Sequence, residues 1–201
     1  MATSAIPTPH RLFIGLMPDR QLQAAIQRHC RQWEWPEQAK PTRFGCYHLT
    51  LCFLGEVGLA PEQRLRKALR EVVVTPLELE LRVPEVWRNH VAVLRPADHD
   101  GLQALQGRVA EAVSQAGLPV VHNTFKAHVT LARNAAQARP PEAVQPIRWR
   151  VDEVVLVWSV LYPQAKPARY EVVERFGVTP GRELGPPAPS GQGGEQLGLW
   201  E

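Results

Sequence analysis

The chain has 201 residues, of which 44% are hydrophobic and 21% are charged, which is close to average globular usage. This composition excludes collagen-like, coiled-coil and low-complexity proteins, and no apolar run approaches the roughly 18–20 residues that span a bilayer. The N-terminus lacks a basic segment followed by an apolar one, so we expect no secretory signal and a cytoplasmic protein. The formal net charge of +3 is compatible with an anionic ligand but does not identify one.

Hydrophobic patterns in chain order predict a mixture of strands and helices. Strands are predicted at residues 11–17, 47–57, 77–83, 86–94, 125–133, 151–161 and 170–178, where apolar residues run together or alternate. Helices are predicted from a cap at Asp19 to residue 35, over residues 61–74, and from Asp98 or Asp100 to Gly117. A loop rich in Ala and Pro is predicted over residues 135–146.

The predicted strands outnumber the predicted helices, and their hairpins favour antiparallel sheets with helices on one face, which is the α+β class. Residues 1–178 are expected to form one domain. Residues 179–201 are rich in Gly, Pro, Ser and Gln, a composition that predicts a disordered tail. The three cysteines, Cys30, Cys46 and Cys52, are too few to form a disulfide framework and are expected to be reduced.

One short pattern occurs twice, as HLTL at residues 48–51 and as HVTL at residues 128–131. In a strand, residues i and i+2 share a face, so His48 and Thr50 point the same way, and so do His128 and Thr130. The repeat predicts an internal duplication with a pseudo-two-fold relation. Each half contributes one equivalent strand, with its imidazole and its hydroxyl, to a shared cleft.

Two imidazoles facing two hydroxyls suit displacement at phosphorus. One imidazole takes a proton from the attacking water and the other protonates the departing alkoxide, since histidine titrates near neutral pH. The threonine hydroxyls can donate hydrogen bonds to the charged phosphate oxygens. A cyclic phosphodiester carries a single negative charge, so this chemistry needs no metal, and we expect neither a metal nor a cofactor.

The paired motifs and their flanks resemble the 2H phosphoesterases, and more closely the bacterial and archaeal RNA 2′,3′-cyclic phosphodiesterases, also called 2′-5′ RNA ligases. The similar segments are RLFIGL at 11–16, HLTLCFLGEV at 48–57, AHVTLAR at 127–133 and LVWSVLYPQAKPARYEVVERF at 156–176. The resemblance implies a bilobal fold in which two antiparallel sheets, flanked by helices, surround a central cleft. It differs at Ala127, where the family usually has Pro.

The resemblance also implies roles for individual residues. His48 would be the proton donor and His128 the proton acceptor. Thr50, Thr130 and Arg133 would bind the phosphate, although strict alternation along the strand puts Arg133 on the face opposite His128. The aromatic ring of Phe13 would either stack on a base or simply pack in the core.

The activity implied is hydrolysis of an RNA terminal 2′,3′-cyclic phosphate to a 2′-phosphate by a monomer that binds RNA ends, including tRNA fragments, and no membrane. Alternatives that keep the cleft are 2′-5′ RNA ligation and hydrolysis of small cyclic nucleotides. A non-catalytic module that binds RNA ends is a further alternative. Cys46, His48 and Cys52 share strand parity and suggest a zinc site, but they are spread along an extended strand and no fourth ligand is evident.

Overall fold

The computed structural model describes residues 9–120, 124–160 and 169–177, so the predicted tail at 179–201 lies outside the described residues. The strands are β1 (His10–Leu16), β2 (Lys40–Pro41), β3 (Leu49–Val57), β4 (Leu77–Val86), β5 (Ala92–Pro96), β6 (Val129–Arg133), β7 (Ile147–Val151), β8 (Val154–Val160) and β9 (Arg169–Phe176). The helices are α1 (Arg20–Cys30), α2 (Leu59–Arg70) and α3 (Asp100–Gln115). This mixture confirms the α+β class.

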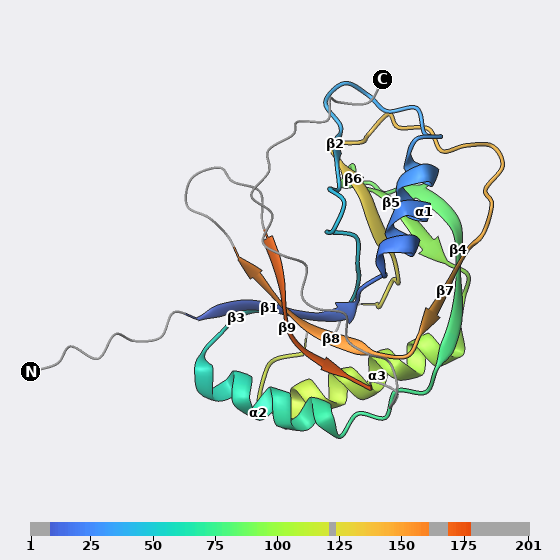
Figure 1. Ribbon diagram of the computed structural model, residues 1–201. Helices are drawn as coiled ribbons and strands as arrows, with labels where there is room; N and C mark the ends of the chain where they lie inside the picture. The colour runs from blue at the N-terminus through green and yellow to red at the C-terminus, as the bar shows by residue number, and fades with distance from the viewer. Residues whose placement is uncertain (1–8, 121–123, 161–168, 178–201) are drawn as a thin grey trace, which may run out of the picture.

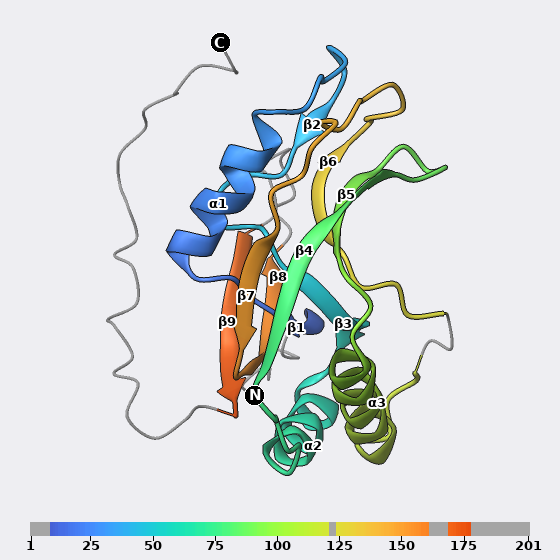
Figure 2. The ribbon, with the colours of Figure 1, turned by 90° about the vertical axis from the view of Figure 1, so that its right-hand side faces the viewer.

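The strands form one antiparallel sheet in the order β7-β4-β5-β6-β3-β1-β8-β9, with β2 paired to β6. The sheet curls strongly (Figure 2). The two central strands, β3 and β6, are joined by a single residue pair, Leu49 with Val129. The two sheets implied by the resemblance are therefore two halves of one sheet that share this narrow junction.

The strand order reads the same from both ends when β3 is exchanged with β6, β1 with β5, β8 with β4, and β9 with β7. In each half a strand, a helix and a second strand occur in this order along the chain, as β1-α1-β3, with the two-residue β2 between α1 and β3, and as β5-α3-β6. Each of these strand pairs is antiparallel. This arrangement is the one expected from an internal duplication whose axis passes between β3 and β6.

The helices cover the sheet from two places. Helices α2 and α3 pack against each other at one end of the molecule, and α1 lies apart from them against β7 (Figure 1).

Asp19 caps α1 by accepting a 2.8 Å hydrogen bond from the Leu22 amide, as predicted. The cap of α3 is His99 rather than Asp98 or Asp100, because its Nδ1 accepts from the Leu102 amide. No described helix is long and apolar enough to cross a membrane.

One predicted strand is split in two. The apolar run at 151–161 is interrupted at Asp152 and Glu153, and its first residue ends β7, which begins at Ile147 just after the predicted loop. Strand β7 pairs with β4, where Trp149 lies opposite Leu79. At this interruption the chain passes from β7, at one edge of the sheet, to β8 in the other half.

Candidate active site

The two histidine motifs meet at the centre of the sheet, where Leu49 of β3 pairs with Val129 of β6. These two residues occupy the same position in their motifs, directly after the histidines. Both side chains are fully buried, so the residues on either side of them point to the opposite, less buried face. Continuing the antiparallel register by one residue sets His48 beside Thr130 and Thr50 beside His128.

Both motif strands carry a β-bulge at the same place. Ile14 pairs with Cys52 but Gly15 pairs with Thr50, so the leucine at position 51 is an extra residue in β3. Likewise, Ala92 pairs with Ala132 but Val93 pairs with Thr130, so the leucine at position 131 is an extra residue in β6. A bulge shifts the alternation of side chains by one residue.

The bulge in β6 explains how the Arg133 side chain comes to lie on the same face of the strand as His128. Strict alternation would direct its side chain away from His128, but the extra residue at 131 returns it to the face of His128 and Thr130. The same shift in β3 brings Phe53 to the face of His48. Arg133 and Phe53 are thus equivalent positions of the two halves, each three residues after the threonine.

The two imidazoles are held in the same way. Nδ1 of His48 lies 2.7 Å from the carbonyl oxygen of Cys46, and Nδ1 of His128 lies 2.7 Å from the carbonyl oxygen of Lys126. A carbonyl oxygen only accepts hydrogen bonds, so Nδ1 carries a proton and donates it in both rings. The second nitrogen, Nε2, is therefore the atom of each ring that exchanges a proton with a ligand.

Burial lowers the pKa of both imidazoles below the ordinary histidine value of 6.5. The bonds to the backbone carbonyls partly oppose this effect, since they favour the charged ring. Neighbouring positive charge lowers the pKa values further: Arg133 acts on both rings, His128 also acts on His48, and Arg95 also acts on His128. The free site thus holds neutral imidazoles at neutral pH.

Aromatic rings surround His48. Phe13 lies 4.8 Å from the His48 ring and Tyr170 lies 5.1 Å from it, measured between ring centroids. Phe13 is only 3% exposed and packs with Val155 and Val157, which leaves little of its surface for a ligand. Its cross-strand partner Phe53 is 48% exposed.

A positive charge lies over this exposed ring. The Arg11 guanidinium carbon is 5.1 Å from the Phe53 centroid, a cation–π contact.

Gly15 lets β1 approach β3 closely next to His48, because a Cβ at residue 15 would lie 2.6 Å from the Leu49 carbonyl oxygen.

A different ring lies beside His128. Trp87, at the turn between β4 and β5, contacts His128 with a centroid distance of 4.4 Å and an interplanar angle of 60°. Its indole Nε1 donates a 2.8 Å hydrogen bond to Glu85, which also accepts a 2.6 Å bond from Arg95. Although partial burial opposes it, these two bonds and the Arg95 charge hold the pKa of Glu85 below its ordinary value.

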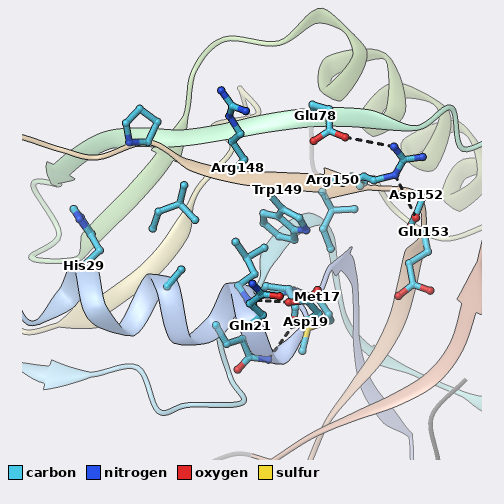
Figure 3. Close-up of a pocket in the computed structure, with 18 of the residues that line it drawn as sticks. Met17, Asp19, Gln21, His29, Glu78, Arg148, Trp149, Arg150, Asp152 and Glu153 are labelled. Carbon is cyan, nitrogen blue, oxygen red and sulfur yellow. Dashed lines mark hydrogen bonds and ion pairs between the residues drawn. The ribbon is translucent and has the colours of Figure 1, made fainter.

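A cavity lies away from the two histidine motifs. A groove of about 1150 Å³ between α1, β7 and the Pro18–Asp19 turn contains neither His48 nor His128 (Figure 3). Its walls carry as many acidic as basic side chains, and several are paired, as Arg150 is with Glu78 and with Asp152. Such a balanced surface offers little attraction to a phosphate.

The zinc site considered from the sequence is not formed. Within residues 9–120, 124–160 and 169–177, no three His, Cys, Asp or Glu side chains gather as metal ligands. Cys46, one of the three proposed ligands, is partly buried, and Cys52 packs in the main core. Both cysteines are free thiols, and burial raises the pKa of each.

The structure brings all six residues singled out in the sequence, Phe13, His48, Thr50, His128, Thr130 and Arg133, to one region of the sheet. It adds residues that the sequence did not single out: Arg11, Phe53, Glu85, Trp87, Arg95 and Tyr170. Arg11, Phe53 and Tyr170 lie within the family-like segments, which was the available signal. No sequence signal marked Trp87, because its contact with His128 depends on how the hairpin folds.

Comparison with solved structures places this fold among phosphoesterases. E. coli LigT complexed with 3′-AMP is 26% identical, with a TM-score of 0.75 over 85% of this chain and 99% of that one. The protein TT0787 of Thermus thermophilus is also 26% identical, with a TM-score of 0.70 over 83% and 96%. A further structure, described as a phosphoesterase, is 26% identical to this chain, with a TM-score of 0.73 over 85% of this chain and 99% of that one. Curated proteins gave no match.

The fold and these neighbours define a phosphodiesterase-type enzyme of the 2H phosphoesterase class. The sequence profile of the 2′-5′ RNA ligase superfamily matches residues 47–162, more than half of the chain and including both histidine motifs. The chain therefore belongs to the 2′-5′ RNA ligase superfamily.

Proposed function

We propose that this protein hydrolyses the 2′,3′-cyclic phosphate at the end of an RNA, leaving a 2′-phosphate. The observation that carries the proposal is the junction at Leu49 and Val129, where two identically held imidazoles and two hydroxyls share one face. A bound nucleotide in a relative, the 3′-AMP in E. coli LigT, supports a nucleotide as the ligand. The partners that follow are RNA ends, including tRNA fragments.

The reaction divides the two histidines between opposite sides of the phosphorus atom. Nε2 of His128 takes a proton from water as its oxygen bonds to phosphorus, and Nε2 of His48 gives a proton to O3′ as the P–O3′ bond breaks. His48 must be protonated for this role. The anionic substrate favours the charged ring and so counters the burial that lowers the His48 pKa.

The remaining groups stabilise charge and place the substrate. The Thr50 and Thr130 hydroxyls and the Arg133 guanidinium donate to the non-bridging phosphate oxygens, whose charge persists through the displacement. The base of the terminal nucleotide belongs on the side of His48, where an exposed aromatic ring can stack on it. There Phe53 offers an exposed ring beside the Arg11 guanidinium.

The test is incubation with an oligonucleotide ending in a 2′,3′-cyclic phosphate, followed by identification of the product isomer. We expect a 2′-phosphate. His48→Ala and His128→Ala should each lose about 10²–10⁴-fold in rate, the usual worth of general acid or base catalysis. His99→Asn is the matched control, because it removes a histidine distant from the motifs while keeping a good capping residue on α3.

A substrate with a good leaving group separates the two roles. A nitrophenyl ester needs little protonation of its leaving oxygen, so His48→Ala should be partly rescued and His128→Ala should not. The reverse pattern would exchange the two roles. Full activity of both variants on the cyclic phosphate would contradict the two-histidine mechanism.

A further inference from the structure

A buried glutamine ties helix α1 to the segment that precedes His48. Gln23, near the start of α1, is only 9% exposed. Its Oε1 accepts a 2.6 Å hydrogen bond from the Gly45 amide, and its Nε2 donates a 3.0 Å bond to the Pro18 carbonyl. A backbone amide only donates and a carbonyl only accepts, so these two partners fix the orientation of the Gln23 side-chain amide.

This tie lies one residue before the carbonyl that holds His48. The Cys46 amide donates a 3.0 Å bond to the Arg43 carbonyl, which closes a tight turn over residues 43–46. Gly45 in this turn has a φ of 88°, a left-handed conformation that suits glycine. The Cys46 carbonyl then accepts from Nδ1 of His48. The position of that carbonyl therefore depends on the turn that Gln23 holds.

A second contact with α1 secures the other side of Cys46. The Tyr47 side chain is fully buried, and its hydroxyl lies 3.7 Å from Sγ of Cys30, the last residue of α1. The Cys46 carbonyl thus lies between two attachments of its segment to one helix.

We propose that Gln23 is a positioning residue for the proposed hydrolysis: it holds the turn so that the Cys46 carbonyl keeps the Nδ1 proton of His48 and Nε2 stays directed at the leaving oxygen. The inference rests on the proposed function, in which His48 is the proton donor. Gln23 acts through the backbone of the turn rather than on the substrate. The step that it assists is therefore protonation of the leaving oxygen, not activation of water by His128.

The bond to the Cys46 carbonyl favours the charged His48 ring and so opposes the burial that lowers the His48 pKa. The other titratable or charged groups that face this ring or act on its pKa are Tyr170, His128 and Arg133. A variant of Gln23 leaves those groups in place and loosens only the carbonyl. Its effect on the His48 pKa is therefore a direct measure of the tie.

Gln23→Leu keeps the bulk of the side chain but makes neither hydrogen bond. We expect the His48 pKa to fall and the His128 pKa to stay unchanged. NMR titration of the two imidazoles in the full chain measures both pKa values without a substrate. The pH profile of kcat/KM should change in the same way, with one limb at lower pH and the other limb unmoved.

The kinetic test compares 2′,3′-cyclic AMP with a nitrophenyl phosphodiester, whose leaving oxygen needs little protonation. A neutral hydrogen bond contributes about 0.5–1.5 kcal/mol, or about 2- to 13-fold. Gln23→Leu should therefore lose about 2- to 13-fold more kcat on cyclic AMP than on the nitrophenyl ester. KM should change little, because Gln23 does not bind the substrate.

Gln21→Leu is the matched control. It makes the same substitution at an exposed position of α1 that lines the same groove as Gln23, and it should leave both pKa values and both rates unchanged. Gly45→Ala disturbs the turn from its exposed side. A Cβ there meets no atom within 4 Å, so only the left-handed φ is strained, and this variant tests the tie even if Gln23→Leu folds poorly. It should lower the His48 pKa as well.

An unchanged His48 pKa in both Gln23→Leu and Gly45→Ala would overturn the inference. An equal loss of kcat on the two substrates would also overturn it, because it would show that Gln23 only stabilises the fold. A wild-type enzyme that does not open cyclic AMP would instead reject the proposed function, whatever the NMR titration shows.

Discussion

Replacing Arg133 with glutamine tests whether the bulge in β6 turns its side chain toward the histidines. Arg133 is exposed, but its charge lowers the pKa of both His48 and His128. If its guanidinium also binds the phosphate, Arg133→Gln removes charge-assisted hydrogen bonds worth about 1.5–3 kcal/mol. We therefore expect kcat/KM for a 2′,3′-cyclic phosphate to fall about 10- to 150-fold.

The same variant should move the pH profile. Burial is the main cause of the low histidine pKa values, and the Arg133 charge adds to it, so removing that charge raises both. Catalysis needs one imidazole charged and one neutral, which gives a bell-shaped profile of kcat/KM. In the wild-type enzyme this bell should be centred below pH 6.5, the ordinary histidine value. In Arg133→Gln both limbs should shift to higher pH.

Arg133→Lys separates charge from geometry. Lysine keeps the positive charge but lacks the planar fork that binds two oxygens at once, so its profile should match the wild type while its rate falls. The assay is steady-state kinetics across the acid and neutral range. An Arg133→Gln enzyme with wild-type rate and unmoved limbs would show that the side chain does not act in the site.

Two further predictions concern metal and acid. EDTA should leave turnover of the cyclic phosphate intact, and complete loss restored by Zn²⁺ or Mg²⁺ would reject the metal-free mechanism. Burial, the main cause in each case, lowers the pKa values of His29, His48 and His128, so the stability they contribute is present above pH 6.5. It is lost as the pH falls below that value, because the unfolded chain then binds more protons. Melting temperature should decline in that window and decline less in His29→Gln; a flat profile would contradict this account.

The common face of each histidine and threonine pair was predictable, because the alternation of side chains along a strand depends only on neighbouring residues. His48, Thr50, His128 and Thr130 share faces by alternation alone, and the flanking letters identified the family. The position of Arg133 was not predictable, because the bulge that turns it depends on how β6 pairs with β5. Nor was β7, a five-residue strand whose pairing with β4 decides its structure. Both features depend on pairing between segments that are distant in the sequence, which a local pattern of residues does not contain.

The near symmetry of the two halves raises the question of what tells His48 and His128 apart. The residue three positions after each threonine differs, since it is Phe53 in one half and Arg133 in the other. Both are turned to the site face by equivalent bulges. An exposed ring suits a base, whereas a guanidinium suits a phosphate oxygen. With the base on the Phe53 side, the O3′ of its ribose lies toward His48, and water enters beside His128. This difference between the halves supports His48 as the proton donor, which the repeated motifs alone do not.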